Sequence, residues 1–220
     1  MRPAVVCVVE GHGEVQALPV LIRRIAAERG IHGLVIPKPI RCPKSKLLRK
    51  RKGVQTEELV RRLRLATAKL SNWEGGAVLI LVDADEDCPA EIGPALSMAA
   101  RTICGNIPCA VVLAKREYEA WFLAAIESLR RAGKLVGHAE APGEPESVSD
   151  PKRCLSRLMP PGRSYRETVD QPAFSALMDL SEAQKCPSFA KLRRDVASLL
   201  DRLTGPGVQP NSPGSQEATP

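Results

Sequence analysis

Residues Val78–Asp87 read VLILVDADED, and the predicted architecture is built around this segment. Its five leading apolar residues run directly into four carboxylates, at Asp83, Asp85, Glu86 and Asp87. A short apolar run bounded by turn-forming residues predicts a strand that is buried on both faces, as in a parallel sheet covered by helices on each side. The four carboxylates therefore lie at the carboxyl end of the predicted strand.

The carboxylates that follow this strand have two interpretations. Crowded carboxylates repel one another, and a hard divalent cation with oxygen ligands would hold them together. Acidic residues are also common in solvated turns and at the start of a helix, where they interact favourably with its dipole. The stretch by itself leaves both interpretations open.

Two further segments repeat the pattern of an apolar strand that ends in polar residues. Residues 4–9 (AVVCVV) lead to Glu10, and residues 108–114 (PCAVVLA) lead to Lys115. Helical spacing follows each of these strands. The alternation of strands and helices predicts an α/β fold with a mostly parallel sheet and helices on both faces.

The remaining elements follow from the same periodicities. A short edge strand is expected within 33–40, where two prolines interrupt the apolar pattern. Helices are expected at 15–29, 55–70, 89–103, 115–131, 150–158 and 188–203. We expect an α/β domain over 1–131, a linker with a helical extension over 132–204, and a disordered tail over 205–220, which has no hydrophobic pattern.

The composition is that of a globular protein with an excess of positive charge. Hydrophobic residues make up 44% of the 220 residues and aromatic residues 3%, which argues against a base-stacking surface for single strands. The net charge of +7 favours an anionic partner. Seven cysteines without a Cys-x-x-Cys pair indicate reduced thiols in a cytoplasmic protein. Neither a membrane span of roughly 20 apolar residues nor a secretory signal is expected.

A basic block lies between the first two predicted helices. Residues 41–52 read RCPKSKLLRKRK, and their seven basic side chains are Arg41, Lys44, Lys46, Arg49, Lys50, Arg51 and Lys52. A solvated loop can have this composition, and so can a patch that binds the phosphates of a nucleic acid. Because the block accounts for the whole net charge, we favour the phosphate-binding interpretation.

Polar side chains from three strand ends are expected to meet at one edge of the sheet, since ligands of such folds bind there. The acidic ones are candidate metal ligands or neighbours of the metal, and one basic residue lies among them. The set comprises Glu10, Glu14, Asp83, Asp85, Asp87, Lys115, Glu117 and Glu119. If the extended backbone continues beyond the strand, Asp83 and Asp85 share a face. His12 lies beside Glu10 and is an additional candidate, because loops at strand ends often carry function.

Two other features have competing interpretations. The Gly-x-Gly at residues 11–13 suggests a dinucleotide site, but the third glycine of that fingerprint and its later acidic strand end are missing. Trp121 and Phe122 lie in a segment of helical apolar spacing, which favours the hydrophobic core over base stacking.

Three segments together resemble a known family. VEGHGEVQALPVLIRRI (9–25), LVDADED (81–87) and EYEAWFLA (117–124) are similar to a Toprim-like family called domain of unknown function 4276. A strand that ends in Glu-Gly, followed by one that ends in Asp-x-Asp, resembles the Toprim domain of topoisomerases, bacterial primases and the overcoming-lysogenization-defect nucleases. The resemblance covers about residues 4–130 and, more loosely, PSFAKL at 187–192.

The resemblance implies a Toprim-like fold and phosphoryl transfer that depends on Mg²⁺ or Mn²⁺. By position, it implies that Asp83 and Asp85 are metal ligands and that Glu10 is a ligand or a general base. Gly13 stands where the nucleases have threonine, whereas Glu14 keeps their second acid and leaves room for a second metal. Lys115 matches the basic residue that these nucleases place near the scissile phosphate.

The leading hypothesis is a magnesium-dependent nuclease, a hydrolase of DNA or RNA. In this hypothesis the ion offsets charge on the phosphate, Glu10 activates water and Lys115 stabilises the developing negative charge. The alternative is a non-catalytic or regulatory subunit that works with a separate ATPase, as some Toprim-like proteins of anti-phage systems do, since this chain has no ATP-binding motif. A third hypothesis is hydrolysis of a small phosphorylated molecule.

Overall fold

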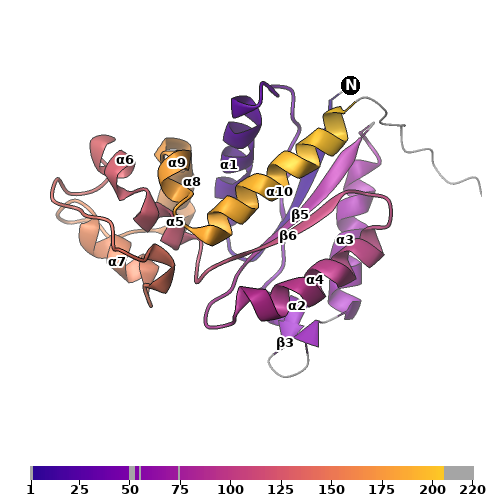
Figure 1. Cartoon of the computed structure of the whole chain (residues 1–220), viewed down its shortest axis with the longest axis horizontal. Helices are drawn as coiled ribbons and strands as arrows, with labels where there is room; N and C mark the ends of the chain where they lie inside the picture. The colour runs from indigo at the N-terminus through magenta and orange to yellow at the C-terminus, as the bar shows by residue number, and fades with distance from the viewer. Residues whose placement is uncertain (1, 50–52, 55, 74, 206–220) are drawn as a thin grey trace, which may run out of the picture.

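A four-stranded, all-parallel sheet forms the centre of the molecule (Figure 1). The computed structural model describes residues 2–49, 53–54, 56–73 and 75–205. The strands follow the order β2-β1-β5-β6, with bounds Ile40–Arg41, Ala4–Val9, Gly76–Asp83 and Cys109–Ala114. All eight residues of β5 are buried, which confirms the central strand predicted from the sequence.

Helices cover both faces of this sheet and enclose a hydrophobic core on each side (Figure 1). On one face lie α1 (Glu14–Glu28) and α10 (Pro187–Thr204), which pack over Leu79 and Leu81 of β5. On the other face lie α3 (Thr56–Leu70) and α4 (Pro89–Cys104), which pack over Val78, Ile80 and Val82 of β5. The predicted α/β fold with helices on both faces is therefore confirmed.

The basic block is more ordered than the loop suggested by its composition. It begins in β2, forms the short helix α2 (Lys44–Leu47), and continues into an antiparallel pair of two-residue strands, β3 (Leu48–Arg49) and β4 (Gly53–Val54). Of the predicted patch, Lys50, Arg51 and Lys52 lie outside the described residues. The edge strand expected within 33–40 is reduced to a single bridge at Val35, with β2 beginning at the end of that range.

The prediction of a single helix over 115–131 is wrong, because two helices occupy this range. They are α5 (Glu119–Ala124) and α6 (Ile126–Arg131), separated at Ala125. Every residue of α5 is buried, so this helix runs through the core. After the break at Ala125, α6 carries exposed Glu127 and Arg131, whereas α5 has no exposed residue.

The region beyond α6 contains more helix than its composition predicts. A 3-10 turn η1 (Pro145–Ser147) and α7 (Pro151–Leu158) are followed by α8 (Glu167–Leu177) and α9 (Leu180–Ala183), neither of which the sequence pattern reveals. Helix α8 packs along α1, and buried residues of α7 to α10 join the core that lies under α1. Residues 206–220 of the predicted tail lie outside the described part of the chain. No described helix is both long and apolar enough to cross a bilayer.

Candidate functional site

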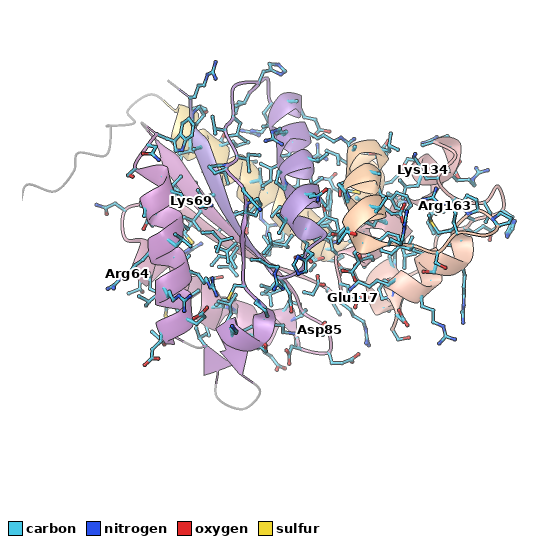
Figure 2. All side chains as sticks on the ribbon, turned by 180° about the vertical axis from the view of Figure 1, so that it is seen from behind. Arg64, Lys69, Asp85, Glu117, Lys134 and Arg163 are labelled. Atoms are coloured by element: carbon cyan, nitrogen blue, oxygen red, sulfur yellow. The ribbon has the colours of Figure 1, made fainter. Side chains whose placement is uncertain are left out.

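The acids that follow the three long strands gather at one edge of the sheet. We define the acidic site as the carboxylates of Glu10, Glu14, Asp83, Asp85, Asp87, Glu117 and Glu119. They come from the end of β1, the start of α1, the end of β5 and the turn after it, the turn between β6 and α5, and the start of α5. In Figure 2, Asp85 and Glu117 mark this edge. Parallel strands bring their carboxyl ends to the same side, which is why residues so distant in sequence meet here.

Three of these carboxylates are buried and held by hydrogen bonds. Asp83 accepts from the Tyr118 backbone N–H at 2.9 Å, and Glu14 accepts from the Gly11 backbone N–H at 2.6 Å. Glu119 is 0% exposed, and its Oε1 accepts a hydrogen bond of 2.8 Å from the Tyr165 hydroxyl. The backbone and a tyrosine therefore fix these side chains in place without supplying positive charge.

Burial and mutual repulsion raise the pKa values of this inner group. Burial, then the charge of Glu10, raises the pKa of Glu14 to about 7, although the Gly11 N–H opposes the shift. Burial also raises the pKa of Glu119 to about 7, against the opposing charge of Lys152. The pKa of Asp83 lies well above its usual value because the group is buried and faces Glu14 and Glu119. Burial and mutual repulsion therefore both disfavour the charged form of these inner carboxyls.

Several oxygen atoms of the acidic site are buried without a hydrogen-bond partner among the described residues. They are Oε2 of Glu10, Oε2 of Glu117 and Oε2 of Glu119. Buried polar atoms normally have a partner, and each exception needs an explanation. These oxygens are suited to the coordination of a hard cation.

Lys44 supplies positive charge to the outer part of the acidic site. Its Nζ lies 2.9 Å from Asp85 Oδ2 and 2.8 Å from Asp87 Oδ2, and its backbone N–H donates to Glu10 Oε1 at 3.1 Å. Burial alone would lower the pKa of Lys44, but the hydrogen bonds to Asp87 and Asp85 outweigh it and raise the pKa. The sequence places Lys44 in a phosphate-binding patch; in the structure it is a buried counter-charge.

Asp83 and Asp85 do not share a face, contrary to the expectation for a continued strand. The strand ends at Asp83, and the backbone of Asp85 is left-handed with φ of 50°. Aspartate tolerates this conformation better than most residues. As a result Asp83 faces the inner group and Asp85 faces Lys44.

Lys152 is a second cation of the site, and sequence reasoning missed it. Its Nζ, on α7, lies 2.9 Å from Glu167 Oε1 and 3.5 Å from Glu117 Oε1. Burial would lower the pKa of Lys152, but the charge of Glu119 and the contacts with Glu167 and Glu117 outweigh it and raise the pKa. No local pattern around Lys152 marks it, since its partners Glu117 and Glu167 lie in the turn before α5 and in α8.

The other predicted residues lie at the surface near this edge. Lys115 is exposed, and its backbone N–H donates to Ser188 Oγ at 3.3 Å. His12 is exposed beside Glu10, and Arg41 and Lys46 are exposed on the segment that carries Lys44. Nothing brings these side chains into the buried group. Trp121 and Phe122 are fully buried, as expected of core residues.

As the side chains stand, no three His, Cys, Asp or Glu residues in the described part of the chain are placed to hold a metal ion. The carboxylates are instead divided between Lys44, Lys152 and hydrogen-bond donors. The donor atoms are nonetheless all carboxylate oxygens, the type that Mg²⁺ and Mn²⁺ prefer.

Comparison with known proteins identifies a family. The sequence model of the family described as Domain of unknown function (DUF4276) matches residues 9–197. Searches of curated proteins and of solved structures give no match. The matched span contains the whole acidic site. It also contains Lys152 of α7, which contacts that site. The chain therefore belongs to the family of domains of unknown function DUF4276.

Proposed function

We propose that this chain is a phosphoryl-transfer enzyme that depends on Mg²⁺ or Mn²⁺, and that it cleaves phosphodiester bonds of DNA or RNA. The burial of Glu14, Asp83 and Glu119 in one group, with raised pKa values, supports this function most directly. Gathering buried carboxylates costs free energy, and a divalent cation is the ligand that would offset it. The resemblance of Glu10-Gly11 and of Asp83-x-Asp85 to the Toprim pattern also supports it.

The acidic site offers the carboxylate oxygens that such an ion prefers, although as the side chains stand no three of these carboxylates, all in the described part of the chain, are placed around one point. Glu10, Glu14 and Asp83 would hold it, because their charges interact and Glu10 Oε2 is without a partner among the described residues. Asp85 and Asp87 would become further ligands if Lys44 released them. When bound, the ion would offset charge on phosphate oxygens and lower the pKa of water.

The side chains of the protein would carry the remaining steps. Glu10 would act as the general base if it does not hold the ion: its pKa, which burial raises above the usual value, suits it to accept a proton from the attacking water. Lys152 would stabilise negative charge that develops on the phosphate, with Lys115 binding a neighbouring phosphate at the same edge. Exposed Arg41 and Lys46 would extend this cationic surface along the nucleic acid.

The test combines metal binding with cleavage. Wild type and Asp83→Asn are titrated with Mn²⁺ by calorimetry and incubated with labelled single- and double-stranded DNA and RNA. We expect Asp83→Asn to lose Mn²⁺ binding and at least about 100-fold in cleavage rate. Asp201→Asn is the control, since Asp201 lies near the end of α10 and pairs with Arg29.

Two results would separate the hypotheses. Metal binding without cleavage of any polymer, but with release of phosphate from small esters, would favour the small-molecule hypothesis. Absence of Mg²⁺ and Mn²⁺ binding by the wild type would contradict the proposed function and favour the interaction subunit that works with a separate ATPase.

A further inference from the structure

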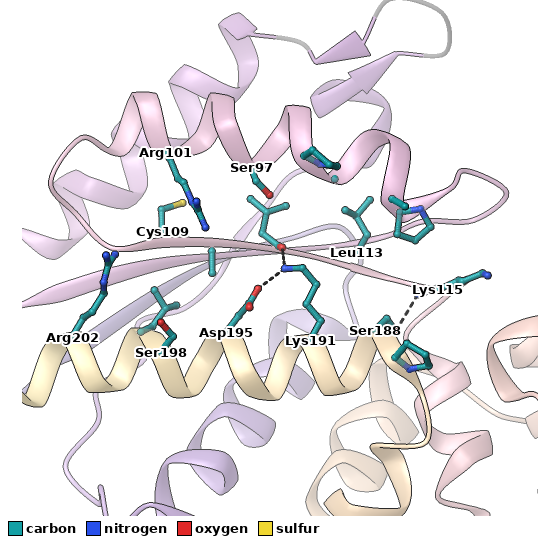
Figure 3. A pocket seen from close by; sticks show the side chains of 18 of the residues that line it. Ser97, Arg101, Cys109, Leu113, Lys115, Ser188, Lys191, Asp195, Ser198 and Arg202 are labelled. Carbon is teal, nitrogen blue, oxygen red and sulfur yellow. Dashed lines mark hydrogen bonds and ion pairs between the residues drawn. The ribbon is translucent and has the colours of Figure 1, made fainter.

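A groove of about 980 Å³ runs along the free edge of the sheet, outside the acidic site (Figure 3). Its floor is the edge strand β6, one wall is α4 and the other wall is α10. Cys109, Ala110, Val111, Leu113 and Lys115 line the floor, from the start of the strand to just beyond its end. The groove therefore has the length and direction of a β-strand.

The backbone of β6 presents hydrogen-bonding groups to this groove. Pro108 O accepts from Val78 N–H and Ala114 O accepts from Ala84 N–H, each at 2.8 Å, so the even-numbered residues face β5. In a parallel ladder the alternate residues then direct their N–H and C=O groups the other way. These are Cys109, Val111, Leu113 and Lys115, which line the groove.

Side chains occupy two of these outward positions. Lys191 Nζ donates to Val111 O at 2.7 Å, where the N–H of a neighbouring strand would donate. Ser188 Oγ accepts from Lys115 N–H at 3.3 Å, where the carbonyl of a neighbouring strand would accept. Among the described residues, we find no hydrogen bond to the outward backbone groups of Cys109 and Leu113. The edge is thus able to pair, and Lys191 blunts it in the way that lysines protect edge strands.

The groove has room for about one strand. From the rise per residue, the strand spacing and the spacing of packed layers, a residue in a sheet occupies roughly 160 Å³. A six-residue strand needs roughly 950 Å³ on that basis, which agrees with the groove volume of about 980 Å³. The wall formed by α4 presents the small residues Ala90, Gly93 and Ser97, which leave room for small or β-branched side chains against it.

Charge identifies the direction and chemistry of the ligand. Arg101 and Arg202 lie on opposite walls at the amino end of β6, as Figure 3 shows, and neither forms an ion pair within the described part of the chain. Two guanidinium groups facing each other favour a carboxylate between them. A strand antiparallel to β6 places its carboxyl end there.

Two other occupants fit less well. The described residues that line the groove include no aromatic side chain, so nucleic-acid bases have no stacking surface. A second copy of the chain, paired through β6 about a twofold axis, would bring its Lys115 toward Arg101 and Arg202. Like charges at such a contact are repulsive.

We infer that this groove binds the extended carboxyl-terminal segment of another protein, which adds a fifth strand antiparallel to β6. Its backbone pairs with Cys109, Val111 and Leu113, small or β-branched side chains lie against α4, and its terminal carboxylate lies between Arg101 and Arg202. Binding of this kind gains affinity from main-chain hydrogen bonds and specificity from alternate side chains. It requires no metal and no catalytic activity.

The probe is a labelled seven-residue peptide in which valine and serine alternate before a terminal aspartate with a free carboxylate. Its binding to the full chain is followed by fluorescence anisotropy. We expect saturable binding that Arg101→Glu with Arg202→Glu weakens at least about tenfold. The control, Arg64→Glu with Arg157→Glu, changes net charge equally at two exposed sites outside the groove and leaves the affinity within about twofold.

Backbone methylation of the peptide distinguishes strand pairing from other binding. Because alternate amides of a strand face its neighbour, N-methylation of either the valine amides or the serine amides abolishes binding, and methylation of the other set leaves it. Equal weakening by both sets overturns the inference. So does absence of saturation at millimolar peptide, or an oligonucleotide that binds more tightly and loses its binding in the Arg101 and Arg202 double variant.

Discussion

Lys44 and Lys152 supply the positive charge of the acidic site, and each reaches its partners across a long stretch of chain. Lys44 contacts Asp85 from 41 positions away, and Lys152 contacts Glu117 from 35. The acids could be predicted because Glu10 and Asp83 directly follow an apolar run and the others lie within a few residues of a strand end. The lysines could not, since their neighbourhood in sequence is unrelated to their neighbourhood in space.

The counter-charge role of Lys44 is directly testable. Lys44→Met leaves Asp85 and Asp87 without their ammonium partner and is expected to lower the free energy of unfolding by about 1–2 kcal/mol, since the two acids are partly exposed. Lys46→Met, two positions away and exposed, is the matched control. Urea unfolding of both variants measures the difference. Equal stabilities of the two variants would show that the buried ammonium contributes nothing.

At the scale of elements, the strands were easier to predict than the helices of the carboxyl-terminal half. The apolar runs of β1, β5 and β6 are local signals and predict the sheet correctly. Helix α8 escapes prediction because Pro172 interrupts its pattern and because it buries polar residues, including Asp170 and Gln171. Its position against α1 depends on contacts across the fold, which periodicity does not encode.

Helix α10 shows that the carboxyl-terminal helices contribute to the core. Phe189 is fully buried, and its ring centroid lies 5.3 Å from that of Trp121 on α5. Phe189→Ala is expected to lower the free energy of unfolding by about 3–5 kcal/mol, because it leaves a cavity in the core. Met98→Ala on α4 is the control, since Met98 is 69% exposed. Calorimetry should show one transition that moves as a whole; a second, unmoved transition would indicate that α10 unfolds separately.

At the scale of the whole molecule, the acidic site makes stability depend on pH. Burial raises the pKa values of Glu14 and Glu119 from 4.5 to about 7. Between these values the folded chain binds more protons than the unfolded chain. The stabilising contribution is therefore complete below pH of about 4.5 and is lost as pH rises through about 7.

The fall in stability with rising pH leads to a prediction for the metal-free protein and for its response to cations. In the presence of a chelator, we expect the contribution of these groups to stability to fall between pH about 5 and about 8, and Glu14→Gln to flatten that fall. Mn²⁺ should stabilise the protein more at the higher pH, because protons no longer compete for the carboxylates. Thermal unfolding at constant ionic strength measures both effects. A Mn²⁺ effect that is independent of pH would argue against these carboxyls as ligands.

The contacts of Lys44 also couple the segment from β2 to β3 energetically to the acidic site. Through the ammonium and the backbone N–H of Lys44, the segment from β2 to β3 is bound to Asp85, Asp87 and Glu10. A cation that competed for these acids would weaken these contacts. A ligand that draws Lys44 away must in turn favour the cation by the same factor, because linkage is reciprocal. Binding of a cation to the acids and binding of a ligand to Lys44 would therefore each raise the affinity for the other.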